Sequence, residues 1–489
     1  MTRCRRIAPL GTLPAFAALL TSGLAVLSGC TSKSPGETSA TSCSVSAPTP
    51  SDWRLVADGT NFKDALGRIV FLRGVAAGGR SKFAPYVPFD YPAGGYATAL
   101  AAYMDHAASW GIDVMRVPFT WAALEPNQGT NDADWLSRYD QLLDAAWARG
   151  IWTVIDFHQD IYAEPFCGDG FPAWTIPYDA GPAVHDCANW SIGYFQDPRV
   201  TSAFDRFWDA GTGVQAAYGS AWDVMVARYK DKPGVLGFEP INEPGWGSAD
   251  ESMFTATTLT AFYSAIVPHM RAAAPTSLVF IDTPGLDGTS VSTTLGKPTG
   301  DGIVFAPHYY PVSTVNAQPA TDLVAWQTIG QMWNVPVFLG EFGASHDGAG
   351  TAAFATSVFD ALDTLSLSGT EWEYSVEGEE WNKESFSLVA ADGGEYAVAK
   401  SVQRPYARAV AGSAITQAFD AMLRTFTLSF KPTAGGVTEV AVPATAYPTG
   451  YDSVVTGGCA SAGSGASAGR LLIQPAANAS SVSLKITPK

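Results

Sequence analysis

Two glutamates in this chain stand in contexts that suit chemistry on a substrate. Glu243 follows Asn242 in the run Glu-Pro-Ile-Asn-Glu-Pro, and Glu341 lies in the run Leu-Gly-Glu-Phe-Gly. Two carboxyl groups can divide the work of breaking an acetal bond, because one protonates the leaving oxygen while the other attacks the carbon. We therefore take Glu243 as the candidate general acid/base and Glu341 as the candidate nucleophile.

Further polar and aromatic residues stand at the ends of short β-rich runs, namely Arg116, His158, His308, Tyr310 and Trp372. Arg116 and Tyr310 are the candidates to stabilise the carboxylate of Glu341. Asn242 can hydrogen-bond a sugar 2-hydroxyl, and the negative charge of Glu341 would keep Glu243 protonated. A lone glutamate at a strand end is usually a surface acid, but the combined set predicts a retaining glycosidase, whose carboxyl groups stand about 5–5.5 Å apart.

The elements that must position these residues alternate between β-rich and helical stretches. The predicted strands are Ile69-Val75, Val114-Phe119, Trp152-His158, Val235-Asn242, Leu278-Asp282, Ile303-Pro307, Val337-Glu341 and Thr370-Tyr374. Predicted helices include Tyr139-Arg149, Ser252-Ala274, Asp322-Trp333 and Thr351-Leu365. This alternation predicts a (β/α)8 TIM barrel, in which catalytic groups cluster at the carboxyl ends of the strands. The fourth and seventh strands would bring Glu243 and Glu341 together.

The remaining chain divides by composition. Residues 31–51 are rich in Ser, Thr and Pro and predict a flexible linker, residues 52–411 hold the barrel, and residues 412–489 predict a C-terminal β-sandwich domain. The stretch from Phe157 to about Gly219 is too long for an ordinary connection and is rich in aromatic residues, including Trp174 and Trp208. We therefore expect an ordered lid over the mouth of the barrel.

The first 30 residues predict a lipoprotein signal peptide rather than part of the fold. Basic residues lead into an apolar run that ends in Leu-Ser-Gly-Cys, which looks like a bacterial lipobox with lipid added at Cys30. Ordinary secretion without lipid is the alternative. In either case we expect an exported protein, as a cell-surface lipoprotein or in secreted form.

The cysteine count and the net charge limit which disulfides, cofactors and binding partners we expect. Besides Cys4 in the signal peptide and Cys30, four cysteines remain, and an even number in an exported protein predicts disulfides. Cys167 and Cys187 would close a short loop, which leaves Cys43 for Cys459.

The expected mechanism needs side chains alone, so no metal or organic cofactor is implied. A formal net charge of −17 argues against nucleic acid and against electrostatic attraction to anionic lipid.

The whole set resembles glycoside hydrolase family 5. The family pattern of Arg, His, Asn-Glu, His-x-Tyr, Glu and Trp matches Arg116, His158, Asn242 with Glu243, His308 with Tyr310, Glu341 and Trp372. This resemblance covers most of the predicted barrel and implies the (β/α)8 fold and hydrolysis of β-glycosides.

A narrower resemblance, to the endoglycoceramidases, is carried by four segments: residues 156–160, 168–174, 306–310 and 404–412. Those enzymes release an intact oligosaccharide from the ceramide of glycosphingolipids. The resemblance implies a glycosphingolipid substrate and contacts of the first sugar with Lys82, Asp160 and Trp190. It also fits a protein that works at a membrane surface through its lipid anchor and its substrate. A monomer is expected.

Two departures from the endoglycoceramidase pattern leave the identity of the first sugar, the one linked to ceramide, open. Gly245 separates the Asn-Glu-Pro run from Trp246, and the segment after the eighth predicted strand is acidic, with Glu371, Glu373, Glu377, Glu379 and Glu380. A preference for galactosylceramide-linked over glucosylceramide-linked chains would fit such changes. Two other functions remain open, namely an endo-β-glucanase or mannanase of the same family and an inactive glycolipid-binding surface protein.

Overall fold

The computed structural model describes residues 43–176, 187–375 and 385–489. The predicted signal peptide with Cys30 and the predicted linker as far as residue 42 lie outside these residues. So do three acids of the predicted acidic segment, Glu377, Glu379 and Glu380. Within the described ranges, no helix is long and apolar enough to cross a membrane.

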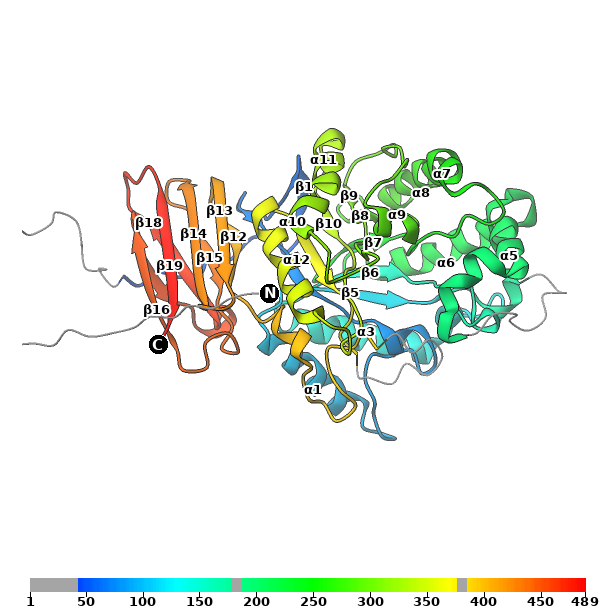
Figure 1. The fold of residues 1–489 in the computed structure, drawn as a ribbon, viewed down its shortest axis with the longest axis horizontal. Coiled ribbons are helices and arrows are strands. Elements are labelled where there is room, and N and C mark those ends of the chain that lie inside the picture. The colour runs from blue at the N-terminus through cyan, green and yellow to red at the C-terminus, as the bar shows by residue number, and fades with distance from the viewer. Residues whose placement is uncertain (1–42, 177–186, 376–384) are drawn as a thin grey trace, which may run out of the picture. The chain divides into compact units, whose positions relative to one another are not determined.

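Eight parallel strands of the described chain form the barrel (Figure 1). They are β4 (Arg73–Ala76), β5 (Val114–Phe119), β6 (Trp152–Phe157), β7 (Val235–Glu239), β8 (Leu278–Ile281), β9 (Ile303–Phe305), β10 (Phe338–Leu339) and β11 (Ser368–Glu371). All their residues are buried, as expected for strands covered by helices outside and packed side chains inside. β11 pairs with β4, and isolated bridges such as Phe305–Val337 join β9 to β10, so the predicted (β/α)8 barrel is confirmed.

Helices cover the strands because each has one apolar face. The main ones are α1 (Tyr96–Ser109), α3 (Ala133–Trp147), α6 (Val214–Tyr229), α8 (Thr260–Ala273), α11 (Val324–Trp333) and α12 (Thr351–Leu365). In α3 the buried residues Trp135, Tyr139 and Leu142 recur at helical spacing, and the side chain of Asp132 caps the first turn. The predicted helix Thr351-Leu365 is found with the same ends, while Ser252-Ala274 divides into α7 (Glu251–Phe254), a π-helical turn (Thr255–Leu259) and α8.

The prediction of one strand over Ile69-Val75 is wrong. The chain forms β3 (Ile69–Val70) and then β4, which belong to different sheets. Between them, the backbone N–H of Phe71 donates to the carbonyl oxygen of Arg408 at 3.1 Å, which ties the crossing point to β12 (Tyr406–Val410). One continuous apolar run can therefore supply strands to two different sheets, because its residues are buried in both.

The C-terminal β-sandwich consists of two antiparallel sheets. One has the order β1 (Val56–Asp58), β2 (Asn61–Lys63), β3, β12, β15 (Thr438–Ala441), β18 (Arg470–Pro475) and β17 (Gly458–Ala462). The other has the order β13 (Gly412–Asp420), β14 (Thr425–Pro432), β19 (Val482–Pro488) and β16 (Tyr451–Thr456). Phe426, Leu428 and Phe430 alternate along β14 with exposed residues and fill the space between the sheets. Residues 56–70, N-terminal to the barrel, thus complete the first sheet.

Two disulfides join the described cysteines in the predicted pairs. Cys167 bonds to Cys187 within the segment that follows β6. Cys43 bonds to Cys459 in β17, so the start of the described chain is attached to the C-terminal sandwich. Covalent closure of the long Cys43–Cys459 loop restricts the unfolded chain more than closure of the short loop does.

Candidate active site

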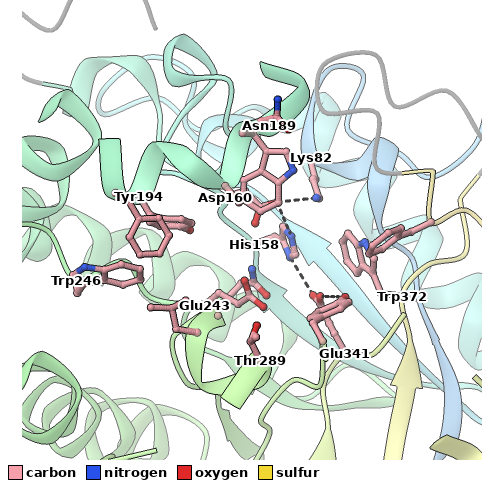
Figure 2. Close-up of a pocket in the computed structure, with 18 of the residues that line it drawn as sticks. Lys82, His158, Asp160, Asn189, Tyr194, Glu243, Trp246, Thr289, Glu341 and Trp372 are labelled. Atoms are coloured by element: carbon pink, nitrogen blue, oxygen red, sulfur yellow. Dashed lines mark hydrogen bonds and ion pairs between the residues drawn. The ribbon is translucent and has the colours of Figure 1, made fainter. Parts of the chain in front are cut away.

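A cavity of about 510 Å³ opens at the carboxyl ends of the barrel strands (Figure 2). Nine of the predicted site residues line it, namely Lys82, His158, Asp160, Trp190, Asn242, Glu243, Tyr310, Glu341 and Trp372. Arg116 and His308 do not line the cavity but lie behind it, 0% and 1% exposed. The structure therefore brings the whole predicted set to one place.

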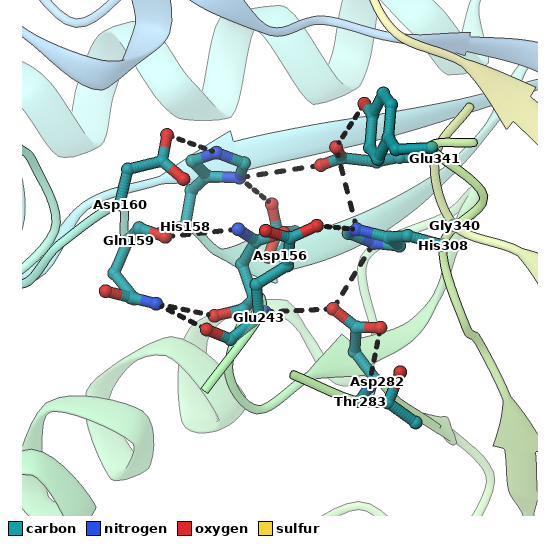
Figure 3. Close-up of polar contacts among 12 residues, drawn as sticks. Asp156, His158, Gln159, Asp160, Glu243, Asp282, Thr283, His308, Gly340 and Glu341 are labelled. Atoms are coloured by element: carbon teal, nitrogen blue, oxygen red, sulfur yellow. Dashed lines mark hydrogen bonds and ion pairs between the residues drawn. The ribbon is translucent and has the colours of Figure 1, made fainter. Parts of the chain in front are cut away.

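The two candidate catalytic glutamates face each other across the barrel. Glu243 follows β7 and Glu341 follows β10. One carboxylate oxygen of each, together with a ring nitrogen of His308, lie within 4.8 Å of one another (Figure 3). Retaining glycosidases hold their two carboxyl groups about 5–5.5 Å apart, whereas inverting enzymes leave room for a water between them. The geometry therefore suits a two-step reaction through a covalent intermediate.

The surroundings of Glu341 favour its ionised form. Burial raises the pKa of Glu341, but the positive charges of His308, Arg116 and His158 lower it to below its usual value. The hydroxyl of Tyr310 also donates to Glu341 Oε2 at 2.8 Å, and Arg116 Nη1 pairs with Oε1. An ionised carboxylate is what a nucleophile requires.

Arg116 links several acids beneath the cavity. Its Nε and Nη2 donate to the two oxygens of Glu239 at 2.8 and 2.7 Å, and Nη2 also donates to Asn242 Oδ1 at 2.8 Å. Nη2 lies 3.0 Å from Asp156 Oδ2. Burial lowers the pKa of Arg116, but the surrounding carboxylates raise it well above the ordinary value, so the guanidinium stays charged. Buried charges persist only in such paired arrangements.

His308 lies between the two glutamates. Its Nδ1 is 2.8 Å from Glu243 Oε1 and 3.7 Å from Glu341 Oε2, and its Nε2 is 3.3 Å from Asp282 Oδ2. Burial lowers the pKa of His308, but the negative charges of Asp282, Glu341 and Glu243 raise it to about 10. The protonated imidazole therefore reduces the repulsion between the two carboxyl groups.

One side of the cavity is polar and aromatic. Lys82 Nζ donates to Asp160 Oδ2 at 2.7 Å and lies 4.7 Å from the ring centre of Trp372, while His158 stacks on that indole at 4.9 Å. Burial raises the pKa of Asp160, but the charge of Lys82 lowers it to well below its usual range. Aromatic faces beside charged hydrogen-bonding groups are suited to bind a sugar.

The opposite side is apolar. Trp246 stacks on Tyr194 at 5.4 Å, and Phe195 packs against Trp246 at 5.4 Å. Phe195 and Leu286 also line the cavity and are 60% and 38% exposed. In Figure 2, Tyr194 and Trp246 lie to the left of Glu243, Trp372 lies to the right of Glu341, and Lys82 lies above the two glutamates. The cavity therefore joins a polar half to an apolar half.

The expectation of a lid formed by the aromatic residues after β6 is only partly met. Trp190 and Tyr194 line the cavity, but Trp174 Nε1 donates to the carbonyl oxygen of Glu125 and Trp208 Nε1 donates to that of Gly245. Both of these side chains pack against other aromatic rings of the protein. Indole groups serve equally well as packing residues, so composition alone did not separate the two roles.

Two glutamates of the predicted acidic segment are buried. Glu371 accepts a hydrogen bond from the hydroxyl of Ser401, and burial raises its pKa to about 8. Glu373 accepts hydrogen bonds from the hydroxyls of Ser375 and Ser387. The described part of this segment thus does not present these two charges to solvent.

Three supporting residues were missing from the predicted set. Glu239 pairs with Arg116, Gln159 Nε2 donates to the carbonyl oxygen of Glu243 at 2.8 Å, and Asp282 accepts from the N–H of Glu243 at 2.9 Å. Burial raises the pKa of Asp282 well above its ordinary value, against the effect of His308. Gln159 and Asp282 stand at or next to the end of a predicted strand, and Glu239 lies inside one. An acid inside an apolar strand requires a partner, and that signal was available in the sequence.

Three groups of acids and histidines in the described chain have a geometry that could hold an ion: His158–Asp160–Asp169, Glu239–Asp282–His308 and Glu243–His308–Glu341. Each group contains one carboxylate that already pairs with a lysine or arginine side chain. Asp160 pairs with Lys82, and Glu239 and Glu341 pair with Arg116. The donor sets thus form an ion-pair network suited to glycoside hydrolysis by side chains.

Replacing Tyr310 with phenylalanine is expected to raise the pKa of Glu341, because the lost hydroxyl favours the charged carboxylate. A hydrogen bond to a charged group contributes about 1.5–3 kcal/mol, so the acidic limb of kcat/KM should move upward by about one pH unit. The pH profile of kcat/KM measures this shift. Tyr309→Phe is the matched control, since its hydroxyl donates to Asp322 instead, at 2.5 Å. An unmoved acidic limb in Tyr310→Phe would contradict the assignment.

Comparison with known proteins agrees with this geometry. Residues 85–378 match the Cellulase (glycosyl hydrolase family 5) model, and residues 404–487 match the glycoside hydrolase family 5 C-terminal domain. Endoglycoceramidase I of Rhodococcus hoagii (strain 103S) is 29% identical over 441 residues, which cover 84% of this chain and 84% of that protein. Endoglycoceramidase of Cyanea nozakii is 25% identical over 411 residues, covering 76% and 80%.

Solved structures share the fold. The ganglioside GM3 complex of endo-glycoceramidase II from Rhodococcus sp. superposes with a TM-score of 0.73 at 23% identity, covering 90% of this chain and 100% of that one. A structure titled endogalactoceramidase gives 0.71 at 23% identity, with 90% and 100% coverage. Since the family match spans more than half of the sequence and includes both candidate catalytic glutamates, the chain belongs to glycoside hydrolase family 5.

Proposed function

We propose that this protein is a retaining endo-β-glycosidase that hydrolyses the bond between the oligosaccharide and the ceramide of glycosphingolipids. The observation that carries the proposal is the division of one cavity into a polar half and an apolar half, with the two glutamates between them. A glycosphingolipid has the same division, with its glycosidic bond at the junction. The relatives named endoglycoceramidase support this substrate class.

In the first step, the carboxylate of Glu341 attacks the anomeric carbon while Glu243 gives its proton to the ceramide oxygen. The glycosidic C–O bond breaks, ceramide leaves as the neutral alcohol, and the sugar is bound covalently to Glu341. In the second step, Glu243 takes a proton from a water that attacks the same carbon, and Glu341 leaves as a carboxylate. Two inversions give net retention of the β-configuration.

The apolar half stands where a leaving lipid would be. Glu243 protonates the leaving group, so the leaving group lies on the Glu243 side, which is also the side of Trp246 in Figure 2. Phe195 packs against Trp246, and Leu286 follows Gly285, which lies beside the Glu243 carboxyl group. Each methylene group removed from water there contributes about 0.8 kcal/mol. A long polysaccharide would instead need sugar-binding groups on both sides, and this difference disfavours the endo-β-glucanase or mannanase alternative. The inactive-binder alternative is disfavoured because Glu341 keeps its ion pair with Arg116 and its hydrogen bond from Tyr310.

The proposal is tested with a ganglioside whose first sugar is glucose, a galactosylceramide-linked glycolipid and carboxymethyl-cellulose. Wild type is expected to release an intact oligosaccharide and free ceramide from at least one glycolipid, and Glu341→Ala is not. The preferred glycolipid identifies the first sugar. Cleavage of cellulose alone would overturn the lipid substrate and leave the family chemistry standing. Inactivity of wild type on all three would favour the inactive glycolipid-binding alternative.

Replacing Phe195 with serine is expected to weaken binding of the lipid portion only. The KM for the glycolipid should rise about 5- to 10-fold, while kcat/KM for a water-soluble aryl β-lactoside stays unchanged. Met332→Ser on α11 is the control, because Met332 is 70% exposed and is not among the cavity residues. If both variants raise the KM equally, or if the aryl lactoside suffers as much as the lipid, the assignment of the apolar wall is wrong.

We also propose that the protein is exported and attached to a membrane surface through lipid on Cys30. The lipobox-like sequence supports this, and the two disulfides support an oxidising compartment. Metabolic labelling with a fatty acid should mark wild type but not Cys30→Ala. Equal labelling of both would refute lipidation at this residue.

A further inference from the structure

Asp282 stands at the carboxyl end of β8, completely buried between the acid/base and His308 (Figure 3). Its Oδ2 accepts the backbone N–H of Glu243 at 2.9 Å and lies 3.3 Å from His308 Nε2. Its Oδ1 accepts the N–H of Thr283 at 2.7 Å. One carboxyl group therefore contacts both the main chain of Glu243 and the histidine that holds the side chain of Glu243.

The main chain of Glu243 needs such support. Its φ is +36°, in the left-handed region that residues with a side chain rarely adopt, so the surrounding structure must hold it there. Asp282 accepts the N–H of this residue, and Gln159 Nε2 donates to its carbonyl oxygen at 2.8 Å. The backbone of Glu243 is therefore held by side chains that follow β6 and β8, the two strands that pair with β7.

The side chain of Glu243 is aimed by the same region. His308 Nδ1 lies 2.8 Å from Glu243 Oε1, and the opposite ring nitrogen is the one that faces Asp282. A Cβ on Gly285, three residues after Asp282, would lie only 2.6 Å from Glu243 Oε2. The chain that leaves β8 thus passes directly against the carboxyl group. The backbone hydrogen bonds, the contact of His308 with Oε1 and the close approach of Gly285 to Oε2 together restrict the orientation of the Glu243 carboxyl group.

We propose that Asp282 is a positioning residue for general acid/base catalysis. It holds the N–H of Glu243 and orients His308, and through both it aims the Glu243 carboxyl group at the leaving oxygen. This inference concerns the acid/base step of the family reaction and does not depend on ceramide being the leaving group. Asp282 itself is fully buried and is not among the cavity residues, so we assign it no direct contact with substrate.

Comparing substrates whose leaving groups differ in acidity can test whether Glu243 is correctly positioned as the general acid. An acid catalyst helps most when the departing oxygen is strongly basic, and helps little when the leaving group is stable as an anion. Phenyl β-lactoside needs more protonation than 2,4-dinitrophenyl β-lactoside, although the sugar is the same. Loss of acid positioning should therefore slow the phenyl substrate selectively, whereas general damage to the fold should slow both.

The experiment measures kcat/KM of Asp282→Ala and Asp282→Asn on both lactosides. For Asp282→Ala we expect a loss of about 100-fold on the phenyl substrate, at the low end of acid/base contributions, and a loss of less than about threefold on the dinitrophenyl substrate. Asp282→Asn keeps an oxygen that can accept the N–H of Glu243 but loses the carboxyl group opposite His308. Its loss on the phenyl substrate should be intermediate, about 10-fold.

Asp363→Asn is the matched control. Asp363 is also a buried aspartate with two ion pairs, to Arg73 and Arg404, but it lies on α12 and is not among the cavity residues. Its substitution should lower the melting temperature without changing the ratio of the two kcat/KM values. Equal losses on both lactosides in Asp282→Ala would overturn the proposal. Because the lactosides contain no ceramide, failure on glycolipids would overturn only the proposed substrate.

Discussion

Replacing Glu341 with alanine is expected to lower kcat by about five orders of magnitude on every glycoside, including aryl glycosides with good leaving groups. Loss of the nucleophile in other covalent mechanisms has an effect of this size. Of the other carboxylates described around the cavity, Asp160 is bound to Lys82, and Glu239 is fully buried and bound to Arg116, so neither is placed to form the glycosyl-enzyme. Steady-state kinetics on dinitrophenyl β-lactoside measures the loss.

Azide provides the stereochemical check for Glu341→Ala. With the nucleophile gone, azide can enter the vacated space and attack the anomeric carbon once, and a single inversion gives the α-lactosyl azide. The product is identified by NMR. The β-azide, or activity close to that of wild type, would show that Glu341 is not the nucleophile. Glu371→Gln serves as a control for the loss of a buried glutamate, because Glu371 contacts Ser401 instead of the cavity.

Replacing Glu243 with alanine is expected to lower kcat/KM strongly for substrates with a basic leaving group and only weakly for substrates with an acidic one. For phenyl β-lactoside, kcat/KM should fall by about 10³-fold, within the usual range for a general acid. For dinitrophenyl β-lactoside it should stay within about tenfold of wild type, because this leaving group departs without a proton. The second step lacks its base, so the covalent intermediate should accumulate, and its mass can be detected on the intact protein.

Azide should rescue Glu243→Ala on the dinitrophenyl substrate, because an anionic nucleophile needs no general base. Attack on the covalent intermediate is a second inversion, so the product should be the β-lactosyl azide. Opposite azide anomers from the two variants would separate the two roles in one pair of experiments. Equal losses of Glu243→Ala on both lactosides, or the same anomer from both variants, would refute the assignment.

Buried positive charges offset the many carboxylates of this site. Arg116 is fully buried and contacts Asp156, Glu239 and Glu341, while His308 contacts Glu243 and Asp282. Removal of a buried cation would leave its carboxylates uncompensated, at a cost of about 3–5 kcal/mol. The same contacts that keep the network stable also lower the pKa of Glu341, so stability and reactivity depend on the same residues.

Much of the barrel followed from the sequence because its information is local. Each strand is a short apolar run, and the helices carry apolar residues at helical spacing, so Val114-Phe119 and Thr351-Leu365 were predicted with the ends that the structure shows. Strand ends could then be identified, and catalytic groups of a parallel barrel gather at those ends. For this reason Glu243 and Glu341 could be chosen before their distance was known.

Local patterns did not reveal which sheet a strand joins. Ile69-Val75 has the composition of one strand, but its two halves pair with β12 and with β5 and β11. Composition also did not distinguish a lid residue from a packing residue. Trp190 lines the cavity, whereas Trp208 packs against Phe207 and Phe262, because exposure depends on neighbours distant in sequence.

By itself the sequence determined the (β/α)8 barrel, the C-terminal β-sandwich and the set of residues that could perform glycoside hydrolysis. Only the tertiary structure decided that Phe195, Trp246 and Leu286 line the cavity together with Glu243, and that Asp282 accepts the N–H of Glu243. The physical reason is that periodicity is written along the chain, whereas burial, charge pairing and the shape of a cavity arise between segments that meet only on folding.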